Sequence, residues 1–145
     1  MISFTKAAFA LLSLCSVSVV ANQAEAASAS IIPTGITITN NTTAPVKLIG
    51  KVNISGEMTP AALGTIEGSK SYIGTSRTTG VMDGGTLQYG PCRFHWSTMQ
   101  TTNPMTGAVS WSFSQTASPA TKCKAVSNTA NYTTGEHAVT FSINN

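Results

Sequence analysis

Apolar and polar residues alternate with a period of two along much of the chain after residue 30. Neighbouring side chains of a β-strand point to opposite faces, so this period indicates strands with one buried and one exposed face. The clearest run is Val109–Ser114 (VSWSFS), in which three apolar residues alternate with three serines. Four further runs repeat the alternation: Ile36–Thr39, Val46–Leu48, Val52–Ile54 and Val139–Ile143.

Residues that favour turns separate these runs. Gly and Asn supply positive φ angles and Pro presets the φ of a turn, so Asn103–Pro104 and Asp83–Gly85 are interpreted as turns. Helix formers with a period of 3.6 are missing, although Met58–Gly68 could contain one short helical turn. The pattern therefore predicts an all-β fold, a single antiparallel β-sandwich with little helix.

The first residues have the features of a secretory signal peptide. Lys6 precedes an apolar run, Ala7–Val20, which is too short to span a bilayer, and small residues follow at a cleavable site. We expect residues 1–26 to be this signal and residues 27–145 to form one domain. The expected location is secreted, either extracellular or periplasmic.

The cysteine count suggests one disulfide. Cys15 would leave with the signal peptide, so Cys92 and Cys123 would be the cysteines of the mature protein. Two cysteines of a small exported domain usually pair, and the loop of about 30 residues that they close would stabilise the fold by about 3 to 4 kcal/mol. Two buried free thiols are the alternative.

The segment Cys92–Ser97 (CRFHWS) places a histidine between two aromatic residues. If it is a strand, Cys92, Phe94 and Trp96 point to one face, whereas Arg93 and His95 point to the other. Phe94 and Trp96 would then form an inner aromatic layer with the aromatic residues of the Val109–Ser114 run. His95 is expected on the outer face.

The residues available for chemistry argue against an enzyme. The whole chain has eight basic and five acidic residues, and the signal peptide removes one of each, so the mature domain keeps a net charge of +3. The histidines, His95 and His137, could share a metal ion with Asp83 or Glu136 only if folding brought them together, and their spacing matches no metal signature. We predict no catalytic residue, metal or cofactor. The scattered basic residues also argue against nucleic acid as a partner.

The order of the segments resembles that of the aegerolysins. The resemblance rests on an early strand (ITITNNTTAPVKL), a segment with a Gly-rich turn (YIGTSRTTGVMDGGTLQYG) and the strand CRFHWS with its His95-Trp96 pair. Aegerolysins are small β-sandwich proteins that bind membrane lipids, and some act in pore formation with a partner protein. The chain departs from the family in its basic charge and in the residues Ser97-Thr98-Met99 after the His-Trp pair.

Two functions follow as hypotheses. The first is a secreted, non-enzymatic protein that recognises a membrane lipid or a cell-surface glycan, as an aegerolysin-like cytolysin component would. Aromatic and cationic side chains suit a lipid headgroup, and the candidate ligand-binding residues are Arg93, His95, Tyr72, Tyr89 and Arg77.

The second hypothesis is an extracellular structural or adhesive surface protein. Low charge and a high content of Ser and Thr in short strands would allow it to self-associate through sheet edges. A protein partner could occupy the same edges.

Overall fold

The computed structural model describes residues 32–145, and the predicted signal peptide lies outside the described residues. Within this range the chain forms ten β-strands and no helix, which confirms the all-β prediction. The strands are β1 (Ile32–Asn40), β2 (Val46–Val52), β3 (Glu57–Thr59), β4 (Thr65–Ile66), β5 (Ser71–Thr78), β6 (Met82–Tyr89), β7 (Cys92–Thr102), β8 (Val109–Ser118), β9 (Cys123–Ala130) and β10 (His137–Ile143).

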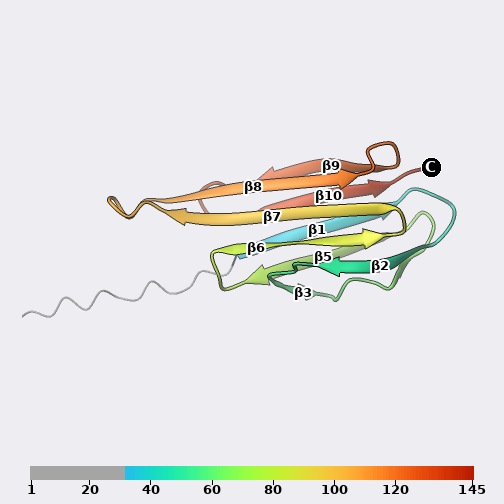
Figure 1. Cartoon of the computed structure of the whole chain (residues 1–145), viewed down its shortest axis with the longest axis horizontal. Helices are drawn as coiled ribbons and strands as arrows, with labels where there is room; N and C mark the ends of the chain where they lie inside the picture. Colours follow the sequence, from blue (N-terminus) through green and yellow to red (C-terminus); the bar gives the residue numbers. More distant parts are fainter. Residues whose placement is uncertain (1–31) are drawn as a thin grey trace, which may run out of the picture.

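The strands form two five-stranded sheets (Figure 1). Sheet A has the order β3-β5-β1-β10-β9, and sheet B has the order β4-β2-β6-β7-β8. All paired strands run antiparallel except β1 and β10, which lie parallel at the centre of sheet A. The predicted antiparallel sandwich is thus confirmed, with one parallel pair that joins the first and last strands.

The core lies between the two sheets, as the period-two alternation requires. Strand β1 shows the rule, because every second residue from Ile32 to Asn40 is buried and those between are half-buried. The core cluster draws apolar residues from both sheets: Ile36, Ile38, Ile66, Tyr72, Leu87, Tyr89, Cys92, Phe94, Trp96, Cys123, Val139, Phe141 and Ile143.

The predicted inner aromatic layer is complete on β7 and partial on β8. Phe94 and Trp96 are fully buried, and the ring of Phe94 packs 5.0 Å from that of Phe141 in sheet A. Trp111 and Phe113 are only half-buried, although they belong to the alternating face of β8. β8 is the edge strand of sheet B, so nothing within the sheet covers its outer side.

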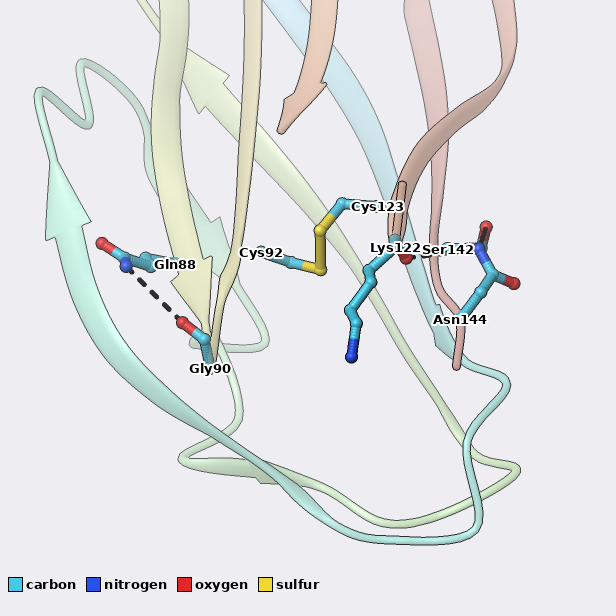
Figure 2. The surroundings of a disulfide bond; sticks show 7 residues. All are labelled: Gln88, Gly90, Cys92, Lys122, Cys123, Ser142 and Asn144. Carbon is cyan, nitrogen blue, oxygen red and sulfur yellow. Dashed lines mark hydrogen bonds between the residues drawn. A yellow bond between two sulfur atoms is a disulfide. The ribbon is translucent and has the colours of Figure 1, made fainter. Parts of the chain in front are cut away.

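The predicted disulfide between Cys92 and Cys123 is present (Figure 2). Cys92 begins β7 in sheet B and Cys123 begins β9 in sheet A, so the bond links the two sheets at one end of the sandwich. Both cysteines are buried. Beside them the backbone N–H of Asn144 donates to the carbonyl oxygen of Lys122 at 2.7 Å, which holds the end of the chain to the turn before β9.

The expected helical turn in Met58–Gly68 is wrong. This segment contains the last two residues of β3 and all of the short strand β4. Two core tyrosines hold the chain between these strands: the Tyr72 hydroxyl donates to the Pro60 carbonyl at 2.8 Å, and the Tyr89 hydroxyl donates to the Leu63 carbonyl at 2.6 Å. These bonds satisfy carbonyl groups that a helical turn would have used internally.

The expected turn at Asp83–Gly85 is also wrong, because all three residues lie within β6. The two glycines are needed for close packing. A Cβ atom at Gly84 would lie 2.7 Å from the carbonyl oxygen of Trp96, and one at Gly85 would collide with the side chain of Ile54. Here glycine marks the close approach of a neighbouring segment within a strand.

The disulfide is expected to contribute substantially to stability. Its two cysteines are 31 residues apart in sequence, and closing a loop of that size restricts the unfolded chain by about 3 to 4 kcal/mol. The double variant Cys92→Ala/Cys123→Ala should lose about this much in free energy of unfolding, measured by urea denaturation. An unchanged denaturation midpoint would contradict the prediction.

The two faces of β7 should differ in their sensitivity to mutation. Trp96→Ala removes a fully buried side chain and should destabilise the fold by about 3 to 5 kcal/mol. His95→Ala removes a half-buried side chain with one hydrogen bond, to Thr86, and should cost about 1 kcal/mol or less. Thermal denaturation of both variants tests the difference, and equal losses would mean that the outer face also contributes core packing.

Candidate functional site

Arg93 and His95 lie on the outer face of sheet B. Arg93 is exposed and His95 is half-buried. The Nδ1 atom of His95 lies 3.2 Å from the hydroxyl oxygen of Thr86 on β6. The two residues are neighbours on one strand face, in line with the sequence prediction, and they remain candidates for contact with a surface ligand.

The other three candidate ligand residues lie elsewhere. The rings of Tyr72 and Tyr89 are buried in the core, where burial raises the pKa of both hydroxyls. Neither ring is therefore exposed to a ligand on the outer surface. Arg77 is exposed on β5 in sheet A, where it lines a shallow pocket with Ser55 and Glu57. The structure does not bring the five candidates together.

A buried polar layer crosses the interior of the sandwich. In sheet A, Thr34 is paired with Ser76 on one side and with His137 on the other. In sheet B, Thr98 is paired with Asp83 on one side and with Phe113 on the other. We call the following residues the polar layer: Thr34, Ser76, Asp83, Thr98 and His137, all of them buried, and Asn128 on β9.

Hydrogen bonds connect this layer across the two sheets. The Ser76 hydroxyl donates to Oδ1 of Asp83 at 2.7 Å. The hydroxyl oxygens of Thr34 and Thr98 lie 3.2 Å apart, and that of Thr98 lies 2.9 Å from Nδ1 of His137. Nε2 of His137 lies 2.9 Å from Oδ1 of Asn128. Sheet A and sheet B are thus joined by polar contacts near the middle of the sandwich.

Burial favours the neutral forms of the two ionisable side chains of the layer, His137 and Asp83. Burial lowers the pKa of His137 to about 4, so its imidazole is neutral at pH 7. A neutral ring that donates from Nε2 to the Asn128 carbonyl must accept at Nδ1, and the Thr98 hydroxyl then donates to it. Burial raises the pKa of Asp83, against the lowering effect of its hydroxyl neighbours Thr34 and Ser76.

Asp83 is tightly enclosed. Its Oδ2 atom has no hydrogen-bond partner among residues 32–145. Gly56 covers the other oxygen: a Cβ atom there would collide with Oδ1 of Asp83 and would lie 2.5 Å from the Ser76 hydroxyl oxygen. Any larger residue at position 56 would therefore displace the carboxyl group.

A hydrogen-bonded chain links the hydroxyl of Thr98, the imidazole of His137 and the amide of Asn128. Some enzymes with a nucleophilic side chain use groups in this order. The Thr98 side chain is 0% exposed and that of His137 is 3% exposed, so a substrate would have no access to the hydroxyl. Holding the two sheets together is the role that this geometry supports.

β8 and β9 are the edge strands of the two sheets on the same side of the sandwich (Figure 1). Neither is paired with a further strand there within residues 32–145, and we call this side the open side. Phe113 lies there beneath Tyr132, with ring centroids 5.0 Å apart in an edge-to-face arrangement, and its ring is also 5.0 Å from that of His137. Tyr132 is 70% exposed and Val126 on β9 is 59% exposed. The polar layer therefore ends directly beneath this open side.

The sequence carries a signal for the polar layer in the polar residues that interrupt two buried faces. Thr34 lies between Ile32 and Ile36 on the buried face of β1, and Thr98 continues the buried face of Phe94 and Trp96. Polar residues in register with a buried apolar face must find partners inside the core. Their presence in neighbouring strands could have indicated a shared network.

The chain matches no protein-family model and no curated protein. The resemblance to aegerolysins therefore stays a prediction. Residues 32–145 contain no helix long and apolar enough to cross a membrane. Within the same range, no three His, Cys, Asp or Glu side chains are grouped so that they could hold a metal ion. His95 lies on the outer face of sheet B, whereas His137 is buried on the inner face of sheet A.

His137 should make stability depend on pH. Its folded pKa of about 4 lies below the unfolded value of 6.5, so the unfolded chain binds this proton first as the pH falls. The free energy of unfolding is therefore highest above pH 6.5, and it falls by about 3 kcal/mol as the pH decreases from 6.5 to 4. The variant His137→Gln should lose this slope in urea denaturation at a series of pH values.

Asp83→Asn is the matched control. The raised pKa of Asp83 changes the free energy of unfolding in the opposite direction, because this free energy falls as the pH rises above the unfolded pKa of 3.8. This variant should keep the loss of stability between pH 6.5 and 4. A His137→Gln variant whose slope equals that of the wild type would contradict the assignment.

Proposed function

We propose that the protein is an extracellular structural protein that self-associates through the edges of its sheets. The observation that carries the proposal is strand β8. It is ten residues long, contains no charged residue, and pairs on only one side within residues 32–145. A long, uncharged edge presents a row of free N–H and C=O groups that another strand can bind.

The other edges of the described sheets are protected. β3 has three residues and β4 has two, which is too short for extensive pairing. β9 carries Lys124 and an irregularity in its pairing with β10 between Thr140 and Phe141. Short strands, charges and bulges are the usual means of preventing edge-to-edge contact. β8 has none of these, and its register with β7 is uninterrupted over ten pairs.

The outer face of β7 and β8 also suits close packing. It carries hydroxyl groups that bond to one another across the strands, as Ser97 does to Ser114 at 2.9 Å and Thr101 to Ser110 at 2.7 Å. Such a face has its hydrogen bonds largely satisfied within the sheet and carries little charge to oppose an approaching neighbour.

Recognition of a membrane lipid or a glycan has weaker support. Arg93 and His95 are adjacent on the outer face, but the aromatic rings that were expected to complete the site belong to Tyr72 and Tyr89 in the core. The exported location is a further element of the proposal. The disulfide is compatible with an oxidising, extracellular compartment.

Size-exclusion chromatography with light scattering, over a range of concentrations of the disulfide-bonded protein, tests self-association. The average mass should rise with concentration. Ser114→Lys on β8 should raise the concentration needed for half-association by roughly tenfold, because lysines of two copies would meet at the contact. Ser97→Lys on β7 is the control, since it adds the same charge to the same face away from the edge. A wild-type protein that stays monomeric at all concentrations would refute the proposed function.

A further inference from the structure

We infer that two copies of the chain associate by antiparallel pairing of their β8 strands around a twofold axis. The inference rests on the proposed function and specifies its partner and geometry. Two copies of sheet B would become one continuous sheet, and the open sides of the two sandwiches would face each other.

The identity of the partner follows from what β8 needs. An edge of ten residues with an uninterrupted register pairs over its full length only with an edge of similar length, and charges or bulges on the partner oppose the pairing. Among the edges formed by residues 32–145, β3 and β4 are too short and β9 is irregular and carries a lysine. β8 of a second copy meets the requirement, and two identical strands without charge meet without repulsion.

The direction of pairing follows from the charges at the two ends of the open side. Arg93 is paired with Ser118 at the end of β8, and Lys122 and Lys124 flank the nearby start of β9, so this end is positive. The opposite end carries Glu136, next to Gly135, where an added Cβ atom would collide with the ring of Trp111 near the start of β8. Arg93, Lys122, Lys124 and Glu136 are all exposed.

Antiparallel pairing places the positive end of one copy beside the Glu136 end of the other. Parallel pairing would place the basic residues of both copies together. The attraction between opposite charges therefore favours the antiparallel arrangement at each end of the contact. Only a closed twofold contact uses the same surface on both copies.

The apolar residues of the open side explain what such a contact would bury. Trp111 and Phe113 on β8 are half-buried, whereas Val126 and Tyr132 at β9 and its following loop are exposed. In a continuous sheet the inner faces of both copies lie on the same side, so the half-exposed rings of one copy come beside those of the other. Each copy would shield apolar surface that its own sheets leave open.

Disulfide trapping distinguishes the pairing directions. The native cysteines are bonded to each other, so a single cysteine introduced on β8 supplies the free thiol. The variants are Ser112→Cys, Ser114→Cys and Thr116→Cys, with Ser97→Cys on β7 as the control. In antiparallel pairing about residue 114, position 114 lies opposite itself and position 112 lies opposite position 116.

The expected result is a strong homodimer crosslink at the one position on the axis, and mixed crosslinks between positions symmetric about it. Parallel pairing through the same free edge would turn the outer faces of the two copies to opposite sides, so it would give no efficient crosslink among these three positions and would overturn the inference. Efficient self-crosslinking at all three β8 positions would mean that the register is not fixed by one twofold axis, and it would also overturn the inference. Self-association without β8 crosslinks would also overturn it while leaving the proposed function standing. A wild-type protein that does not associate would refute the proposed function itself.

Charge reversal provides a second readout by light scattering at low ionic strength. Lys124→Glu and Glu136→Lys should each weaken association by about two- to fivefold, and the double variant should restore it. Lys51→Glu on β2, away from the open side, is the matched control and should have no effect. A double variant weaker than either single variant would exclude the antiparallel arrangement.

Discussion

The two sheets of residues 32–145 have four edge strands, and the length and charge of each edge determine whether another strand can pair with it. A closed barrel has no edges, but a sandwich must shorten, charge or distort each one to remain separate from its neighbours. At one side of this sandwich both edges are very short, β3 with three residues and β4 with two. At the other side β8 and β9 are long, and Trp111 and Phe113 on β8 are half-buried where no further strand of residues 32–145 lies beside it.

The interior is divided along the strands into two different regions. One end is apolar and is fixed by the disulfide between Cys92 and Cys123, with Phe94 packed on Phe141 beside it. Further along, the polar layer replaces apolar contacts with hydrogen bonds that link Thr98 to both Thr34 and His137. Sliding one sheet along the other would leave these groups against apolar side chains, which is costly. The layer therefore favours one relative position of the two sheets.

The sequence predicted the features that depend on local periodicity. Alternation identified the inner residues of β7, and the cysteine count identified the disulfide. Periodicity cannot predict which strands pair, because the parallel contact of β1 with β10 joins residues about a hundred positions apart. Composition was misleading at Asp83–Gly85, where glycines that resemble a turn allow Ile54 and the backbone of Trp96 to approach β6. The affinity of aromatic residues for ligands predicts a surface position for Tyr72 and Tyr89, but their rings lie in the core and their hydroxyls donate to carbonyl groups.

The polar layer and the open edge are physically connected through Phe113. This residue is paired with Thr98 in the sheet, and its ring lies 5.0 Å from both the buried His137 and the exposed Tyr132. His137 in turn contacts Asn128 on β9, so one imidazole is in contact with residues of both long edge strands. A neutral ring accepts from Thr98 and donates to Asn128, whereas a protonated ring would have to donate at both nitrogens. Protonation of this buried ring would therefore reverse the bond at Nδ1, so that the Thr98 hydroxyl would accept from His137 and donate to Thr34.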